Sequence, residues 1–169
     1  VNLQNIREAA ERYESWHPHG PCSSPTHVVA ALEVSLDKIL AEGLDNRFRR
    51  FATCAKACRE GFKAMGIELL VEDAYASNTV TSFCVPEGAT DSGTVDLMRE
   101  RFDIIIANSH HPHLLGKMLR VGHLGMTADQ NCILLTLTAL AESFTMQGAK
   151  VDSSAAIDAA LSVFREEQP

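Results

Sequence analysis

The chain has 169 residues, a formal net charge of −7 and a hydrophobic fraction of 46%. This composition excludes a disordered chain and predicts one domain large enough for a core. The acidic balance argues against nucleic acid or an anionic membrane as a partner. No apolar run approaches the roughly 20 residues that span a bilayer, and no signal peptide is evident, so we expect a cytoplasmic protein.

Helical periodicity dominates the first part of the chain. Apolar residues recur at steps of three and four, which predicts three amphipathic helices at 3–16, 25–42 and 45–65. The stretch 17–25 between the first two carries three prolines and a glycine, which exclude a helix. We therefore expect an extended connection and a boundary there.

Helix-capping residues stand at several of these borders. Ser24 is expected to cap the second helix, with Pro25 at its first position. Gly66 is expected to end the third helix in a left-handed conformation. Thr127 and Gln130 have the spacing of a capping box, which predicts a further helix from that point.

After residue 66 the pattern changes to short β-branched or alternating runs. These predict strands at 67–71, 79–85, 104–106 and 118–121. A short helix is expected at 94–102, and a last one after residue 152. The connection 108–116 is expected to lie outside the core. The order predicts an α+β fold: a small, mainly antiparallel (mixed) sheet backed by helices.

The five cysteines form no CxxC pair, and an odd number does not suggest a disulfide framework. Cys54 and Cys58 are four residues apart among small apolar side chains, so they share one side of a helix. Free cysteine commonly packs as a small hydrophobe. Both are therefore expected in the core.

Three histidines, His110, His111 and His113, lie close together in the predicted loop. Such a cluster could bind zinc or nickel if the rings converged. Adjacent histidines on an extended backbone point to opposite sides, and no cysteine or carboxylate stands at ligand spacing. We expect a solvated loop and no metal site.

Arg120 is a full positive charge inside the apolar run Met-Leu-Arg-Val, directly before a Gly-His-Leu-Gly turn. Burying an unpaired guanidinium is costly, so this side chain either faces solvent or meets an anion. A planar fork beside glycines suits bidentate binding of a carboxylate. An exposed or ion-paired structural arginine is the alternative.

Several short motifs occur in an order and spacing that resemble a known family. They are Ser23-Ser24-Pro25-Thr26 with the apolar run that follows, Glu42-Gly43-Leu44, Met65-Gly66-Ile67, Thr79-Val80-Thr81, Val85-Pro86-Glu87-Gly88 and Gly116-Lys117-Met118-Leu119-Arg120-Val121-Gly122-His123-Leu124-Gly125. Over residues 1–147 the chain resembles the C-terminal part of class V pyridoxal-phosphate aminotransferases, in the branch of alanine–glyoxylate and serine–pyruvate enzymes.

The resemblance implies the small domain of a fold-type I transferase, divided into the end of the large domain and connector at 1–24, the small domain at 25–150 and an extra C-terminal helix at 151–169. Arg120 matches the arginine that binds the substrate α-carboxylate. Ser23 matches the hydroxyl residue that helps hold the cofactor phosphate across the dimer interface. The family's upstream aromatic residue and its Gly-rich loop are not matched, since Gly20 and Pro21 and the histidine loop occupy those places.

None of the five lysines matches the residue that forms the Schiff base with pyridoxal 5'-phosphate. The resemblance therefore implies a portion of a homodimeric aminotransferase acting on a small amino acid and a 2-oxo acid, with no catalytic residue in this chain, a missing N-terminal large domain and no cofactor held by the chain alone. The alternative is a stand-alone ligand-binding or dimerisation module with the same fold and no catalysis. Apolar surface on the first helix and the following connection predicts self-association.

Overall fold

The computed structural model describes residues 3–13 and 25–167. The chain divides into two compact units, Val1–Leu44 and Asp45–Pro169, and each is described by itself. The connection predicted at 17–25 lies, apart from Pro25, outside the described residues. No helix in the described part of the chain is long and apolar enough to cross a membrane.

The first unit contains the helices α1 (Leu3–Tyr13) and α2 (Thr26–Glu42). None of the residues of α2 is buried, although many of them are hydrophobic. Val28, Leu32 and Leu40 have 55, 54 and 75% of their surface exposed. The helix therefore gains little stability from packing within the described chain.

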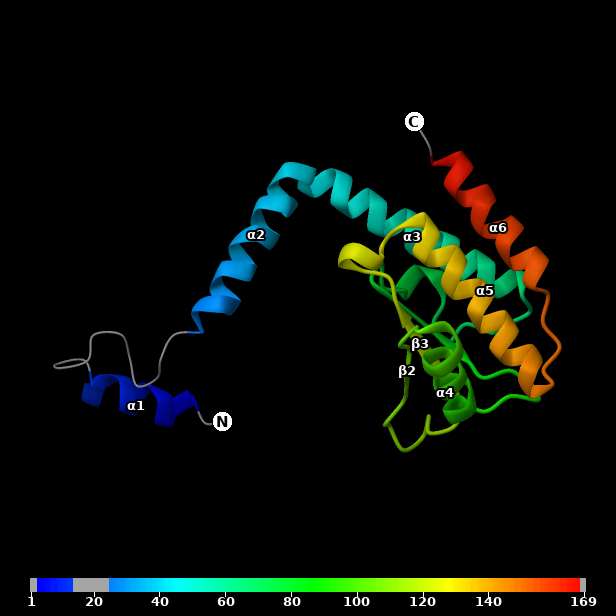
Figure 1. Cartoon of the computed structure of the whole chain (residues 1–169), viewed down its shortest axis with the longest axis horizontal. Helices are drawn as coiled ribbons and strands as arrows, with labels where there is room; N and C mark the ends of the chain where they lie inside the picture. Colours follow the sequence, from blue (N-terminus) through cyan, green and yellow to red (C-terminus); the bar gives the residue numbers. More distant parts are fainter. Residues whose placement is uncertain (1–2, 14–24, 168–169) are drawn as a thin grey trace. The chain divides into compact units, whose positions relative to one another are not determined.

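The second unit holds the core and all the strands (Figure 1). Its elements in chain order are α3 (Leu44–Ala64), the 3₁₀ turn η1 (Asp73–Tyr75), β1 (Val80–Cys84), α4 (Asp91–Phe102), β2 (Ala107–Asn108), β3 (Met118–Gly122), the 3₁₀ turn η2 (Gly125–Thr127), α5 (Gln130–Gln147) and α6 (Ser153–Glu166).

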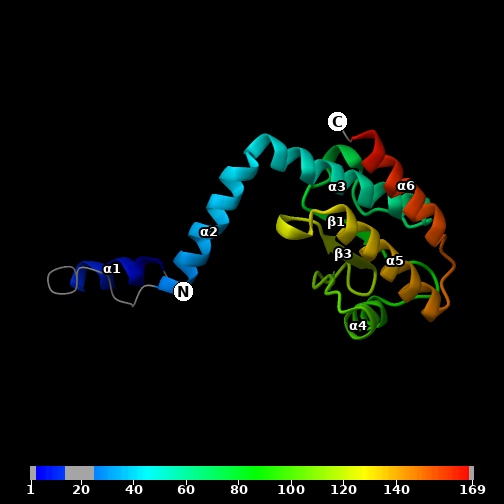
Figure 2. The ribbon, with the colours of Figure 1, turned by 45° about the horizontal axis from the view of Figure 1, so that its top comes forward.

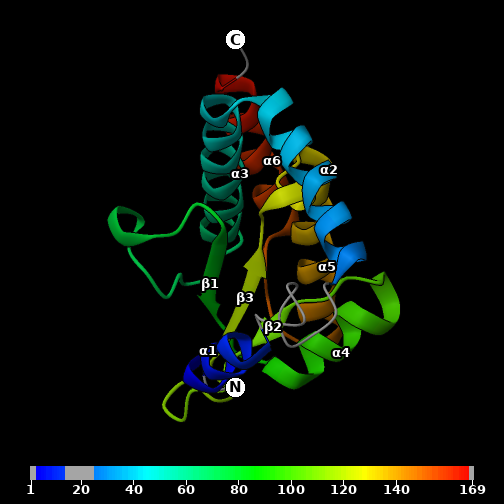
Figure 3. The same cartoon turned by 90° about the vertical axis from the view of Figure 1, so that its left-hand side faces the viewer.

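The three strands form one antiparallel sheet in the order β1-β3-β2, so β3 is central (Figure 3). Helices α3, α5 and α6 pack together over one face of this sheet, and α4 contacts β2 and α5 (Figure 2). The expected α+β fold, with a small antiparallel sheet backed by helices, is confirmed.

Aromatic side chains join the sheet to the helices. Phe83 of β1 stacks on Phe62 of α3 with 4.2 Å between ring centroids, and Phe144 of α5 meets Phe83 edge-on at 6.5 Å. All three are fully buried. Pairs of this kind add about 0.5–1.5 kcal/mol to the free energy of area burial. This face of the sheet is the core side.

The helices approach closely at Gly61 of α3. A Cβ atom on Gly61 would lie 2.5 Å from Cδ1 of Leu137 in α5 and 3.3 Å from the carbonyl oxygen of Ala156 in α6. Only a hydrogen fits in this space, so glycine allows the three helices to meet here.

Two of the predicted strands, 67–71 and 104–106, are wrong because neither range forms a strand. Residues 67–71 form no strand; only Leu69 bridges to Phe83, although Leu70 N donates to Ser82 O. Residues 104–106 precede the observed β2, since Ala107 is the residue that pairs with Arg120. In the same register Ile106 and Ile105 would lie opposite Val121 and Gly122 of β3, but the pairing stops at Ala107. The strands at 79–85 and 118–121 are confirmed with small changes at their ends.

The helix borders correct the capping predictions in two places. Helix α2 begins at Thr26, with Pro25 as its N-cap rather than its first residue, and Ser24 lies outside the described residues. Helix α5 is capped by Asp129, which accepts from the amides of Asn131 and Cys132. The predicted capping box is therefore wrong, since the Thr127 hydroxyl donates instead to Leu124 O at 2.9 Å.

Two other helix ends agree with expectation, and the start of α4 does not. Gly66 has a φ of 84°, as predicted for the end of α3. Asp152 caps α6 by accepting from the amide of Ala155. Helix α4 starts three residues earlier than predicted, because the Thr90 side chain accepts from Gly93 N.

Cys54 and Cys58 are core residues, with exposures of 2 and 1%. Burial raises the pKa of Cys54 to about 11 and that of Cys58 to about 12. Both thiols therefore stay protonated at neutral pH and are poor nucleophiles.

Candidate carboxylate-binding site

Arg120 lies in the middle of the sheet, on the central strand β3. Its cross-strand neighbours are Ser82 of β1 and Ala107 of β2. Directly opposed residues in an antiparallel pair share one face, so these three side chains lie on the face opposite to the core. Arg120 is solvent-exposed there.

The alternation of β3 explains this orientation. Leu119 and Val121, on either side of Arg120, are buried at 0 and 4% exposure and occupy the core side. Because successive side chains of a strand point to opposite faces, packing these two directs the guanidinium outward. The apolar neighbours thus hold a charge at a fixed place on the outer face.

The guanidinium of Arg120 makes no hydrogen bond or ion pair with any residue in the described ranges 3–13 and 25–167. All five of its donors are free to bind a ligand from outside this part of the chain. An exposed guanidinium with free donors can bind a planar anion, and the two oxygens of a carboxylate match the spacing of its N–H groups.

The turn that follows β3 is tied down from two directions. His123 N donates to Thr79 O at 2.9 Å, next to the start of β1. Arg50 of α3 donates through Nη1 to the carbonyl oxygens of Gly125 at 3.0 Å and Ala128 at 2.6 Å. These bonds fix the backbone immediately after Arg120.

His123 itself is completely buried. Its Nε2 lies 2.8 Å from Oγ1 of Thr81, and its Nδ1 has no hydrogen-bond partner in the described structure. Desolvation lowers its pKa below the usual value near 6.5, and the charge of Arg59 acts in the same direction. The imidazole is therefore neutral at pH 7.

The histidine loop follows β2 on the chain. His110, His111 and His113 are all exposed, and the rings of His111 and His113 lie 5.4 Å apart, tilted by 42°. Within the described residues, no group of three or more His, Cys, Asp or Glu side chains is gathered so that it could hold a metal ion. One expectation for this connection is wrong in part, since Asn108 belongs to β2 and Ser109 is buried.

The lysines do not form a site for pyridoxal phosphate. A lysine that forms a Schiff base needs a lowered pKa, whereas hydrogen bonds to Asp73 and Glu60 raise the pKa of Lys63. Lys56 is ion-paired with Glu166 and Glu167. The other three, Lys38, Lys117 and Lys150, are exposed. The described residues thus do not fit the cofactor.

Ser23, the expected phosphate ligand, lies outside the described residues. Arg120 and Ser23 are therefore not placed together, and the role of each stays a prediction.

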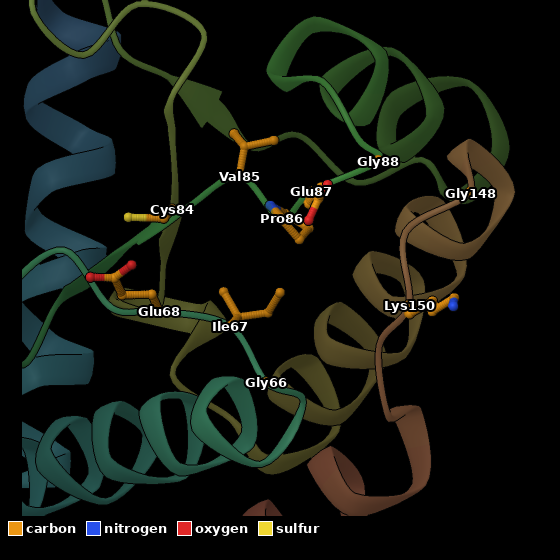
Figure 4. A pocket seen from close by; sticks show the side chains of 10 residues that line it. All are labelled: Gly66, Ile67, Glu68, Cys84, Val85, Pro86, Glu87, Gly88, Gly148 and Lys150. Carbon is orange, nitrogen blue, oxygen red and sulfur yellow. The ribbon is translucent and has the colours of Figure 1, made fainter.

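A cavity of about 670 Å³ opens elsewhere, between the residues that follow α3, the end of β1 and the residues that follow α5. Figure 4 shows Glu68 and Cys84 extending to one side of it and Lys150 to the opposite side. The charged groups at its rim do not converge. Arg120 is not among the lining residues, so this cavity is separate from the carboxylate-binding candidate.

Comparisons with known proteins relate the whole arrangement to enzymes. No protein-family model matches the sequence. An uncharacterised aminotransferase of Methanocaldococcus jannaschii is 35% identical over 146 residues, which are 86% of this chain and 37% of the relative. The crystal structure of pyridoxamine–pyruvate aminotransferase from Mesorhizobium loti has a TM-score of 0.82 at 30% identity, covering 92% of this chain and 40% of that one.

A second solved structure, ureidoglycine–glyoxylate aminotransferase from Bacillus subtilis, also has a TM-score of 0.82, at 28% identity over 94% of this chain and 41% of that one. The helix-backed sheet is thus the architecture of one part of an aminotransferase. The chain belongs to the class V aminotransferase family and corresponds to the C-terminal part of its relatives. It spans a little over a third of the length of the relatives it matches.

Sequence reasoning found Arg120 but not the residues that fix its surroundings. His123 and Thr81 both belong to motifs that carry the family resemblance, yet nothing in a linear pattern shows that their side chains meet. Arg50 lies 75 residues before Gly125, its partner. It had no signal beyond being one of several arginines on an amphipathic helix.

Proposed function

We propose that this chain is the C-terminal portion of a pyridoxal-phosphate-dependent aminotransferase. The enzyme would move an amino group between a small amino acid, like alanine or serine, and a 2-oxo acid such as glyoxylate or pyruvate. The observation that carries the proposal is the guanidinium of Arg120, which has no partner in the described part of the chain and is held outward from the central strand within a chain of this family.

In this proposal Arg120 binds the α-carboxylate of the amino acid and of the 2-oxo acid. Two parallel N–H···O bonds fix the plane of the carboxylate as well as its position. The α carbon of the substrate is then oriented relative to the reacting groups, which lowers the entropic part of the barrier. The arginine supplies binding and orientation and no proton transfer.

The chemistry at the α carbon is supplied by the cofactor and by a lysine outside this chain. Because the described lysines are exposed or ion-paired, we expect no transaminase activity from these 169 residues by themselves. We propose that an N-terminal large domain provides that lysine, in a homodimer. The hydroxyl of Ser23 would reach the cofactor phosphate of the other subunit.

The names of the relatives support the substrate class. The similar enzymes include a pyridoxamine–pyruvate transaminase and a (S)-ureidoglycine–glyoxylate transaminase, and each name contains a small 2-oxo acid. All these acceptors carry a carboxylate next to the carbonyl group. One arginine that binds this shared group would serve each of them.

The test uses the chain joined to its natural upstream sequence. Arg120→Ala is expected to weaken amino-acid binding about 10- to 100-fold, the usual effect of losing a charged hydrogen-bonding partner. Arg101→Ala on the exposed end of α4 is the matched control and should leave binding unchanged. Cofactor absorbance above 400 nm reports that the enzyme is loaded.

Unchanged amino-acid affinity in a cofactor-loaded Arg120→Ala enzyme would show that the carboxylate assignment is wrong. The native mass tests the larger proposal. A protein of 18.4 kDa with no cofactor absorbance in its native cell would instead favour the stand-alone binding or dimerisation module.

A further inference from the structure

The buried pair of His123 and Thr81 has no role in the function proposed above. His123 is fully buried, Thr81 is 4% exposed, and Nε2 lies 2.8 Å from Oγ1. Burying an imidazole is costly unless it is hydrogen-bonded, and here only one of its two nitrogens has a partner in the described structure. The site therefore tolerates a cost that an apolar residue would avoid.

The missing partner at Nδ1 selects one form of the ring. If Nδ1 carried the proton, a buried N–H would have no acceptor, and orphaned donors are rarer in proteins than unsatisfied lone pairs. With the proton on Nε2, the ring donates to Thr81 Oγ1, and only the lone pair of Nδ1 is left without a partner. Thr81 also acts on Cys58, where its hydrogen bond lowers the thiol pKa that burial raises. In this tautomer the hydroxyl oxygen of Thr81 accepts from His123, and its hydrogen can be donated toward the sulfur.

The pair lies directly behind the carboxylate-binding candidate. Thr81 precedes Ser82, the cross-strand neighbour of Arg120, and it is itself paired with Val121. His123 follows Arg120 by three residues, just past the end of β3. The side-chain bond therefore joins β1 to the end of the arginine's own strand, alongside the backbone bond from His123 N to Thr79 O.

A strand of five residues needs this support. On its other side β3 pairs with β2 at only two positions, Ala107 and Asn108. Beyond Arg120, toward the turn, no further residue of the described chain pairs with β3 on the β2 side. The contact to β1 thus determines where this end of the strand lies.

We propose that His123 is a positioning residue: as a neutral imidazole protonated at Nε2, it fixes the end of β3 to β1 and so sets the place of Arg120 for the substrate carboxylate. This inference rests on the proposed role of Arg120. It also gives the site a sensitivity to acid, since a second proton would put an unpaired N–H at Nδ1 in the core.

Burial and the side chains of α3 oppose that second proton, and the polar backbone groups of His123 and Asn78 offset this only in part. Helix α3 places two groups near the ring: Arg59, whose positive charge disfavours an imidazolium, and Cys58, whose thiol is neutral at pH 7. Arg59 is paired with the carboxylate of Asp73 of η1 at 2.7 Å, and Asp73 is also bound to Lys63. No free carboxylate of the described residues is thus arranged to stabilise a charged His123.

The experiment compares His123→Gln and His123→Phe in the full-length, cofactor-loaded enzyme. Glutamine retains a donor near Nε2 that does not titrate, and phenylalanine fills the space without one. We expect His123→Phe to raise KM for the amino donor about tenfold with little change in kcat, because a displaced arginine binds the carboxylate less well at every stage. His123→Gln should restore KM to within about twofold, and its KM should rise less than that of the wild type on acidification.

A second variant and a spectroscopic readout separate positioning from mere folding. Thr81→Val keeps the shape and removes the acceptor, so it should raise KM as His123→Phe does, at an unchanged cofactor absorbance. Nitrogen NMR of the wild-type protein should show one ring N–H on His123, at Nε2.

Wild-type KM in a folded His123→Phe or Thr81→Val enzyme, or a proton found on Nδ1, would overturn the inference. Arg120→Ala distinguishes this failure from that of the proposed function. If Arg120→Ala weakens binding while His123→Phe does not, only the positioning role is lost.

Discussion

At the scale of single residues, Arg120 shows how an apolar strand presents a charge. Burial of its neighbours Leu119 and Val121 against the helices stabilises the fold, so the guanidinium is directed outward, where it has no polar partner among the described residues. Packing on the other face thus fixes the backbone from which the arginine side chain extends. A ligand that binds it displaces only water.

The shape of the guanidinium can be tested apart from its charge. Arg120→Lys keeps the positive charge but replaces a planar fork with a point charge. We expect the lysine variant to bind amino acid about 3- to 30-fold more weakly than wild type, yet more tightly than Arg120→Ala. Titration of the loaded enzyme with amino acid measures this. Equal affinities of the lysine and wild-type enzymes would argue against two-point binding.

His123 also predicts a pH dependence of stability. Its folded-state pKa is below the unfolded value near 6.5, so the unfolded chain binds more protons as the pH falls through that value. The free energy of unfolding should therefore decrease from about pH 6.5 downward until the folded-state pKa is reached. Urea unfolding at pH 7.5 and 5.5 measures the decrease.

His123→Gln should show a smaller decrease over this range, because its side chain does not titrate. His110→Gln, on the exposed loop, is the control and should lose stability as the wild type does. A decrease of the same size in all three proteins would place the titrating group elsewhere.

At the scale of elements, the loop ends depend on glycines in two different ways. Gly66 and Gly88 both have positive φ angles, 84° and 93°. A Cβ on Gly66 would meet nothing within 4 Å, whereas one on Gly88 would lie 3.1 Å from backbone atoms of Gly148 and Ala149. The first glycine supplies conformation alone, and the second also allows two backbone segments to approach.

The two sites therefore predict unequal costs for the same substitution. Gly66→Ala is expected to lower the free energy of unfolding by about 1–2 kcal/mol, the cost of a left-handed alanine. Gly88→Ala should cost clearly more, because rigid backbone must also move. Urea unfolding of both variants tests this order, and a cost for Gly66→Ala equal to or above that for Gly88→Ala would contradict it.

The elements also show what a linear pattern can and cannot predict. Helix α3 and strands β1 and β3 were predicted because periodic burial determines them. The isoleucines at 104–106 are as β-prone as any run in the chain, yet Ile105 is 87% exposed and forms no strand. In the register of the sheet Ile106 and Ile105 would lie opposite Val121 and Gly122 of β3, yet the observed pairing stops at Ala107. A β-prone composition alone therefore does not determine where a strand begins.

The candidate site was likewise predictable only in part. Arg120 was found because a charge in an apolar strand is visible in the sequence. The bonds from Arg50 to the turn and from His123 to Thr81 cross 75 and 42 residues. The first exists only after α3 has packed beside the turn, and the second only after β1 and β3 have paired. Such contacts are outside what spacing can indicate.

At the scale of the whole molecule, the two units differ in how they are stabilised. The second unit has aromatic contacts between sheet and helices, whereas α2 of the first unit has no buried residue. Its leucines and valines form an apolar surface open to water within the described chain. Surfaces of this kind commonly mark contact sites for other protein.

We therefore expect the isolated chain to self-associate. Leu32→Lys combined with Leu36→Lys should shift it toward monomer in sedimentation experiments, because the two residues are one helical turn apart on α2. Leu135→Lys on α5 has a similarly exposed leucine and serves as the control, which should leave association unchanged. A wild-type chain that sediments as a monomer at high concentration would contradict the expectation.

Because α2 has no buried residue, hydrogen exchange of its amides can report when another surface covers this helix. Amides in a helix without buried side chains open easily and exchange their hydrogens with solvent early, whereas those of the core exchange only on global opening. In deuterium-exchange mass spectrometry, peptides from 26–42 should label rapidly in the isolated chain and slowly once another surface covers them. Docking could thus be followed on this helix without substrate, cofactor or catalysis.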